Sequence, residues 1–207
     1  YINRVRSVCG PMVQEICHEL RQEFEISATP HLIGSGARNL IMQNNNNGID
    51  LDYNIEICYC NDIEDCKQIK ADVMNASNTI LNNHGWGNCK DSRSCVETEE
   101  RVFNVGNRTP FSIDIGIVTR DKEGNWYRLI HKKTGIVQYD EWYWNIVPNS
   151  KGLKNKVYFI KSNGYWTELR DEYKRIKNLY LSRSYYDDSH PSFVCYIEAI
   201  NNIYNRI

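Results

Sequence analysis

The stretch Ile49–Ile57, which reads IDLDYNIEI, alternates apolar and polar residues without a break. This period of two predicts a half-buried β-strand, because successive side chains of a strand point to opposite faces of the sheet. Leu51 then faces the core, whereas Asp50 and Asp52 share the other face. Two carboxylates about 7 Å apart along one strand repel each other unless a cation binds between them. The stretch therefore predicts a strand that carries a cation-binding face.

A third carboxylate lies on a second strand of the same kind. Residues 111–118 (FSIDIGIV) alternate again, with Asp114 between two isoleucines. If this strand lies beside the first, Asp50, Asp52 and Asp114 form a three-carboxylate site. Carboxylate oxygens suit Mg²⁺, and Mn²⁺ is an alternative with the same ligand preference. We therefore expect these three aspartates to be metal ligands.

A glycine-rich turn precedes the first of these strands. A short strand at 30–33 ends at the Gly-Ser-Gly turn that starts at Gly34. The backbone N–H groups of such a turn, the Ser35 hydroxyl and the start of a helix can receive a phosphate. Arg38 either reaches the same phosphate or is an ordinary surface residue. Gly34, Ser35 and Arg38 are thus the candidate nucleotide-binding residues.

The remaining elements follow from periodicity and turn residues. Apolar residues at helical spacing predict a helix near 4–25, split or kinked at Pro11, because proline lacks the N–H group that a helix interior uses. The asparagine run at 44–47 indicates a solvent loop. The other expected elements are helices at 37–43, 62–82, 165–181 and 192–204, a strand at 101–105, and a hairpin with strands at 111–118 and 126–131.

Three motifs, in this order, resemble those of the DNA polymerase beta-like nucleotidyltransferase superfamily. Gly34-Ser35 matches its Gly-Ser motif, Asp50 and Asp52 match its acidic–apolar–acidic strand, and Asp114 matches its third acidic residue. The run GSGAR is also similar to the small nucleotidyltransferases that include antibiotic-modifying enzymes and toxin–antitoxin partners.

Two features depart from the pattern of that superfamily. Fourteen residues separate Ser35 from Asp50, which is slightly long, and Asn39 stands where the small enzymes usually have glycine. The resemblance covers about residues 30–120. It implies an α+β fold, a mixed nucleotidyltransferase-type sheet with flanking helices. We expect a core with an N-terminal helix over 1–146 and a helical C-terminal subdomain over 147–207.

The resemblance also implies an activity. A metal-dependent nucleotidyltransferase moves a nucleoside monophosphate from an NTP, ATP among them, to a hydroxyl and releases pyrophosphate. Asp50, Asp52 and Asp114 would be the catalytic residues and hold two Mg²⁺ ions, and Asp114 could also take the proton of the attacking hydroxyl. A catalytically inactive nucleotide-binding or antitoxin-like interaction module is the alternative.

The identity of the acceptor stays open. A second nucleotide, a small-molecule hydroxyl, an RNA 3′ end and a protein side chain all carry a suitable nucleophile. The formal charge of −1 gives no overall attraction to nucleic acid, and 207 residues leave little room for an RNA-binding domain. We therefore favour a nucleotide or another small acceptor.

Composition indicates a folded protein, with 41% apolar and 25% charged residues. No apolar run approaches the roughly twenty residues of a membrane span, and no secretory signal opens the chain. We expect a cytoplasmic protein without a membrane partner. The sequence does not indicate its oligomeric state.

Eight cysteines lie without the dense framework of a small secreted domain. Cys17 and Cys195 fall in apolar helical stripes, and we interpret the eight as free thiols. A zinc site is an alternative hypothesis, although the two-residue spacing of strong zinc motifs is missing. Its ligands would come from Cys58, Cys60, Cys66, His84, Cys89 and Cys95.

The segment 151–183 is locally basic, with nine Lys or Arg against three Asp or Glu. One interpretation is a surface that binds a triphosphate or nucleic acid, with aromatic rings that stack on bases. The other, which we favour, is a solvated basic helix whose aromatic residues pack in a core. The aromatic residues concerned are Tyr158, Tyr165, Trp166, Tyr173 and Tyr180.

Overall fold

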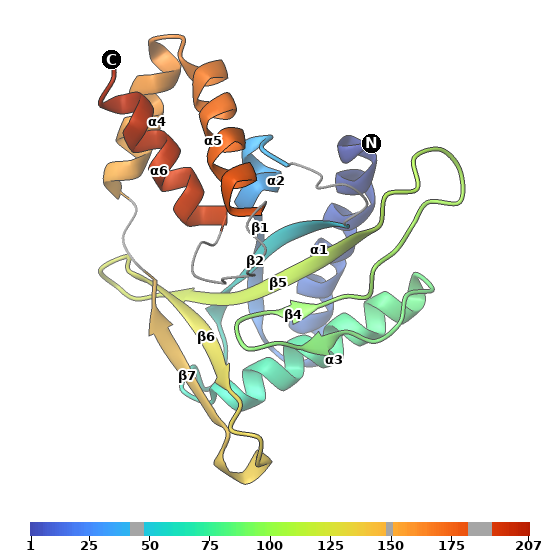
Figure 1. Cartoon of the computed structure of the whole chain (residues 1–207). Coiled ribbons are helices and arrows are strands. Elements are labelled where there is room, and N and C mark those ends of the chain that lie inside the picture. Colours follow the sequence, from blue (N-terminus) through green and yellow to red (C-terminus); the bar gives the residue numbers. More distant parts are fainter. Residues whose placement is uncertain (42–47, 148–150, 182–191) are drawn as a thin grey trace. The chain divides into compact units, whose positions relative to one another are not determined.

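The computed structural model describes residues 1–41, 48–147, 151–181 and 192–207 (Figure 1). The chain divides into two compact units, Tyr1–Pro148 and Asn149–Ile207, and each has its own buried core. The expected asparagine loop at 44–47 lies outside the described residues. None of the described helices is both long and apolar enough to cross a bilayer.

The first unit is built on a mixed sheet. The described strands number seven, and five of them are ordered β1-β2-β5-β4-β3. The strand β6 pairs with the end of β5, on the edge of β5 away from β2, and β7 pairs with β6. The strands β2 and β5 are parallel, and the other pairs are antiparallel. The strands are β1 (Ser27–Leu32), β2 (Ile49–Tyr59), β3 (Lys90–Asp91), β4 (Val96–Glu97), β5 (Phe111–Arg120), β6 (Trp126–Lys132) and β7 (Glu141–Ile146). This mixed sheet with helices confirms the expected fold class.

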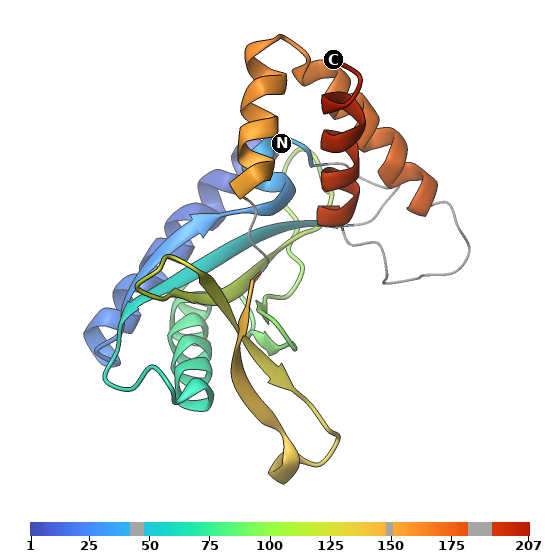
Figure 2. The ribbon, with the colours of Figure 1, turned by 90° about the vertical axis from the view of Figure 1, so that its left-hand side faces the viewer.

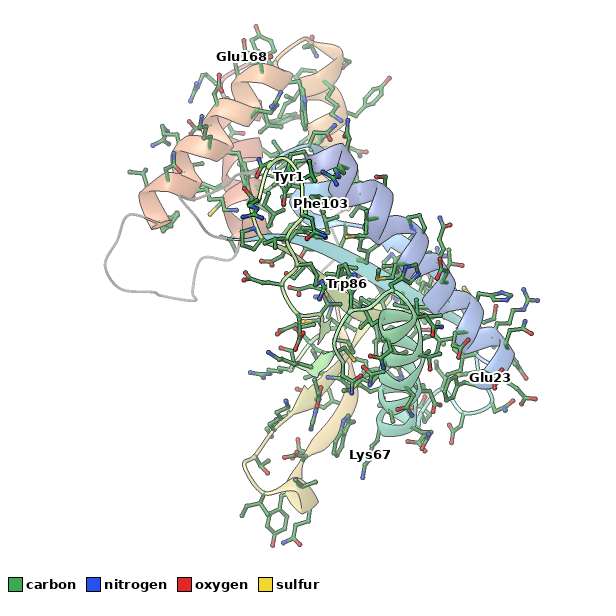
Figure 3. The ribbon with its side chains drawn as sticks, turned by 90° about the vertical axis from the view of Figure 1, so that its right-hand side faces the viewer. Tyr1, Glu23, Lys67, Trp86, Phe103 and Glu168 are labelled. Carbon is green, nitrogen blue, oxygen red and sulfur yellow. The ribbon has the colours of Figure 1, made fainter. Side chains whose placement is uncertain are left out.

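Two long helices cover one face of the sheet. The helices α1 (Ile2–Glu23) and α3 (Cys66–Asn83) pack side by side, and their apolar stripes meet the inward residues of β2 and β5 (Figures 2 and 3). Leu51 is fully buried in this core, as its place in the alternating strand predicts. The opposite face carries the polar residues of the same two strands, because side chains alternate along each strand. Two short helical segments complete the unit, α2 (Gly34–Arg38) and the 3₁₀ turn Val137–Tyr139.

Two sequence-based expectations about the helices of this unit need correction, and one of its strands was not expected. The helix α1 runs through Pro11 as one continuous helix. An interior proline costs roughly 3 kcal/mol, whereas burying one large apolar side chain is worth about 1.5–3 kcal/mol, so the buried stripe of α1 outweighs it. The helix expected at 62–82 begins at Cys66, after Asp65 caps its first turn. The strand β7 was not expected.

The strand expected at 101–105 is also wrong. Arg101 forms one isolated bridge with Phe111, and no strand is assigned there. Phe103 instead packs against the start of α1, where its ring lies 5.9 Å from the Tyr1 ring and 3.9 Å from the Arg4 guanidinium carbon (Figure 3). The ring also lies 4.8 Å from the Phe111 ring on β5, so Phe103 contacts both the helix and the sheet.

A buried ion network ties β6 to the β3–β4 connection. His131 is 5% exposed, and its two ring nitrogens lie 2.6 Å from Asp91 Oδ2 and 3.1 Å from Asp140 Oδ2. The buried Lys70 forms an ion pair with Asp91 and donates to the carbonyl of Ser92. These contacts fix the segment from which β4 starts.

The second unit consists of α4 (Lys151–Ser162), α5 (Trp166–Leu181) and α6 (Ser192–Tyr204). Periodicity predicts α5 and α6 to within one residue, whereas α4 was not expected. The aromatic residues of the basic segment differ in burial, and the binding interpretation stays a prediction. Tyr173 is 2% exposed and belongs to the core, whereas Tyr158 is 76% exposed.

The cysteines are free thiols in the structure. Cys17 and Cys195 are buried, as expected. Within the described ranges, no group of three or more His, Cys, Asp or Glu side chains is arranged to hold a metal ion. The zinc hypothesis therefore finds no support.

Candidate functional site

The parallel pairing of β2 and β5 brings two of the expected carboxylates together. Asp52 lies directly opposite Asp114 in the register, and Asp50 lies opposite Ser112. All of these side chains belong to the sheet face that α1 and α3 leave uncovered. The adjacency that the two alternating strands suggested is therefore present.

The surroundings of Asp114 raise the pKa of its carboxyl group. Partial burial, followed by the nearby charges of Asp50, Glu97 and Asp52, raises the pKa of Asp114 to about 7. Crowding of carboxylates raises a pKa because each negative charge disfavours the next ionisation. A carboxyl that titrates near neutral pH can exchange a proton under physiological conditions.

Glu97 is a fourth acidic residue that the sequence did not reveal. It lies on β4 directly opposite Asp114, on the other side of β5 from Asp52. The strand β4 has only two residues, Val96 and Glu97, so it shows no period that sequence reading could detect. Pairing across a sheet, rather than sequence spacing, places this carboxylate.

Ser112 is a further residue at this site that the sequence left out. Its hydroxyl donates a hydrogen bond to Asp50 Oδ1. The position is visible in the alternation of β5 as the polar residue two before Asp114, but a serine there carries no signal of its own.

The carboxylate row has the donor chemistry of a magnesium site. Its groups are carboxylates, whose oxygens Mg²⁺ prefers. Burial and then the neighbouring carboxylates raise the pKa of Asp114, and a bound divalent cation would relieve the part due to the neighbouring charges. As they stand, the side chains of the described part of the chain form no group of three ready to coordinate a metal. Asp50 is exposed, with its carboxylate bonded to Ser112.

The Gly-Ser turn packs directly on Asp52. Gly34 has φ +62°, and a Cβ atom at this position would lie 2.0 Å from Asp52 Oδ2. The N–H of Ile33 donates to the carbonyl of Asp52 at 2.8 Å. Only glycine permits this approach, because any side chain would displace the carboxylate. The turn and the acidic row therefore form one continuous surface.

The helix after the turn is shorter and earlier than expected. It starts at Gly34 and ends at Arg38, whereas the sequence predicts a helix over 37–43, of which 42–43 lie outside the described residues. Asn39 ends it in the left-handed conformation, with φ 55°. Asparagine tolerates that conformation better than most residues, which explains why it can replace the glycine of the small enzymes. Ser35 lies in the first turn of this helix.

Two arginines donate hydrogen bonds to residues of the Gly-Ser turn and of the short helix that follows it. Arg38 donates from Nη1 to the carbonyl of Gly34 at 2.9 Å. Arg6, on α1, donates from Nη2 to the carbonyl of Gly36 and to Asn39 Oδ1. Sequence reasoning missed Arg6, because only folding brings α1 to the turn.

Comparison with solved structures places this fold among those of nucleotide-handling enzymes. The Elizabethkingia meningoseptica CdnE cyclic dinucleotide synthase, solved with GTP and Apcpp, has a TM-score of 0.57 at 15% identity, over 95% of this chain and 69% of that one. CdnC of Escherichia coli MS115-1, solved with ATP, has a TM-score of 0.60 at 12% identity, over 99% and 60%. The GTP-bound form of Vibrio cholerae DncV has a TM-score of 0.59 at 13% identity, over 95% and 52%.

The present chain thus spans from about half to about two thirds of these proteins' lengths. No protein-family model and no curated protein sequence matches it. The likeness is one of architecture, and it agrees with the motif order Gly-Ser, Asp-x-Asp and a third Asp. The chain therefore has a nucleotidyltransferase-type fold, similar to the folds of these three proteins.

Proposed function

We propose that the protein is a metal-dependent nucleotidyltransferase that transfers a nucleoside monophosphate from an NTP to a hydroxyl group. The observation that carries the proposal is the contact between the Gly34 turn and Asp52, beside Asp114. A phosphate-binding turn and a row of carboxylates on one surface meet the needs of a triphosphate and its cation.

The residues of the site would divide the work. The backbone around Gly34 and the Ser35 hydroxyl bind phosphate oxygens, and Arg38 keeps the turn in shape through its bond to the Gly34 carbonyl. Asp50, Asp52 and Asp114 are the proposed metal ligands. Mg²⁺, or Mn²⁺ in its place, would neutralise phosphate charge and lower the pKa of the attacking hydroxyl.

Asp114 is the proposed proton acceptor. It is a carboxylate on β5 directly beside Asp52, at the place where the attacking hydroxyl would meet the proposed metal ligands. The hydroxyl oxygen then attacks the α-phosphorus, the bond to the bridging oxygen breaks, and pyrophosphate leaves with that oxygen. Asp52, fixed by its contacts with the turn, holds the row in place.

The proposed acceptor is a hydroxyl of a second nucleotide. This choice rests on the architectural likeness to one protein described as a cyclic dinucleotide synthase, solved with GTP and Apcpp, and to one described as a cyclic AMP-GMP synthase. The net charge of −1 also fits a small acceptor better than a long nucleic acid.

The test is incubation of the protein with Mg²⁺ and the four NTPs, singly and in pairs, with mass spectrometry of the products. Linked nucleotides and pyrophosphate are expected from the wild type, and Asp52→Asn should reduce both by at least about 100-fold. Absence of any transfer product with each NTP pair and with Mg²⁺ or Mn²⁺ would instead favour a non-catalytic nucleotide-binding module.

A further inference from the structure

The polar face of the sheet continues beyond the carboxylate row. Asn54 follows Asp52 on the same face of β2, and it lies opposite Gly116 of β5. Two residues along a strand span about 7 Å, so this second row lies that far from the proposed reaction centre. A nucleotide with its α-phosphate at the first row would reach the second row with another of its parts.

Arg128 brings a positive charge to this second row. It lies on β6 opposite Val118 of β5, and its Nη2 atom donates to Asn54 Oδ1 at 3.2 Å. A Cβ atom at Gly116 would lie 2.7 Å from Asn54 Oδ1 and 3.5 Å from the Arg128 guanidinium carbon. Because Gly116 has no side chain, Asn54 and Arg128 can lie directly against the sheet at this position.

The Arg128 guanidinium has a hydrogen-bond donor left over. Its Nε atom is buried, and no hydrogen-bond partner for it exists within the described part of the chain. A buried donor without an acceptor costs about 1–3 kcal/mol. The side chain as a whole is only partly buried, so a ligand with oxygen or nitrogen acceptors would meet the charged guanidinium at its other nitrogens.

A second arginine on the same face makes the contrast clear. Arg120 donates from Nε to Glu56 Oε1 at 2.6 Å, and its guanidinium carbon lies 4.7 Å from the Trp126 ring centroid. Its Nε donor is therefore occupied by a protein acceptor. Arg128 lies nearer the carboxylate row and keeps the corresponding donor unused.

We propose that Arg128, held by Asn54 over Gly116, donates hydrogen bonds to a nucleotide whose reacting phosphate lies at the carboxylate row. This inference rests on the proposed function and identifies a binding residue for it. The forked geometry of a guanidinium suits either a pair of phosphate oxygens or the O6 and N7 atoms of guanine. Both groups occur in nucleotides. Binding to phosphate would not depend on the identity of the base, whereas binding to O6 and N7 would require guanine.

The test measures equilibrium affinity in Mg²⁺ for three ligands: GTP, ATP and inorganic tripolyphosphate. Arg128→Gln should weaken binding by about tenfold or more, since a charged hydrogen bond is worth roughly 1.5–3 kcal/mol. Arg128→Lys keeps the charge without the fork and should recover only part of the affinity. Arg120→Gln is the matched control, with the same loss of charge on the same face, and should bind nearly as the wild type does.

The pattern across ligands identifies the group that Arg128 binds. An equal loss for all three ligands indicates phosphate, and a loss for GTP alone indicates the guanine edge. Thermal melting of each variant measures its stability. A purely structural role of Arg128 would lower the melting temperature and would weaken the binding of all ligands alike, in Arg128→Gln and Arg120→Gln equally.

The outcomes separate this inference from the proposed function. If the wild type transfers nucleotides and Arg128→Gln binds all three ligands unchanged, the inference is wrong and the function stands. If Arg128→Gln weakens binding but the wild type transfers nothing, the function is wrong and the binding site stands. A wild type that binds none of the three ligands contradicts both.

Discussion

Replacing Asp114 by asparagine should stabilise the metal-free protein at neutral and alkaline pH. The wild-type carboxyl has a folded-state pKa of about 7, against an ordinary value of 3.8, because of partial burial and the charges of Asp50, Glu97 and Asp52. A folded-state pKa above the unfolded value means that ionisation opposes folding. The wild type therefore loses stability as pH rises from about 4 to about 7, and asparagine removes that loss.

The size of the effect follows from the same shift. A rise from 3.8 to about 7 corresponds to roughly 4 kcal/mol as an upper limit, since one pKa unit equals about 1.36 kcal/mol. The carboxyl is partly exposed, and water screens its neighbours' charges, so we expect about 1–2 kcal/mol. For a chain of this size each kcal/mol raises the melting temperature by about 2–4 °C.

Urea unfolding in EDTA, at pH 5 and at pH 8, measures the effect. The difference between Asp114→Asn and wild type should be small at pH 5 and reach about 1–2 kcal/mol at pH 8. Added Mg²⁺ should then stabilise the wild type more than the variant, because the variant lacks one proposed ligand. A difference that is the same at both pH values, or that favours the wild type at pH 8, refutes the reasoning.

Three further substitutions test other parts of the structure. Gly34→Ala should abolish nucleotidyl transfer and lower the free energy of unfolding by at least about 1–2 kcal/mol. The reason is that φ is +62° and the added Cβ would lie 2.0 Å from Asp52 Oδ2. Turnover measures the first effect and urea unfolding the second. His131→Ala should cost about 1–3 kcal/mol in urea unfolding, because the buried imidazole loses its hydrogen bonds with Asp91 and Asp140, while Asp91 keeps its ion pair with Lys70. Hydrogen bonding, mainly from Arg175, lowers the pKa of Glu172 to about 2. The ionised Glu172 therefore stabilises the fold above about pH 4.5, and this stabilisation disappears toward pH 2. In a pH series of melting curves, Glu172→Gln should match the wild type only at the acid end.

Strict alternation was the strongest signal in the sequence. It predicted β2 and β5 and, through them, the face on which Asp52 and Asp114 meet. The signal is strong because one face of each strand is buried, so a shift of one residue would expose the whole apolar set. The Gly-Ser turn was readable for a similar reason, since its glycine is required by contact with Asp52.

The parts that sequence reading missed depend on long-range contacts. Glu97 joins the acidic row through a two-residue strand, and Arg6 reaches the turn from a helix thirty residues earlier. Phe103 contacts Tyr1 at the start of α1 and Phe111 of β5, and both contacts join residues that only the folded chain brings together. Arg128 belongs to the correctly expected hairpin, but its contact with Asn54 depends on the absence of a side chain at Gly116.

The most direct test of nucleotidyl transfer is pyrophosphate release from an NTP mixture in Mg²⁺, measured for wild type and Asp114→Asn alongside their NTP affinities. Transfer at the carboxylate row predicts pyrophosphate from the wild type and at least about a 100-fold lower rate from the variant, with both proteins folded and both binding NTP. Equal rates for the two proteins, or no release from a wild type that binds NTP, would contradict nucleotidyl transfer at this site.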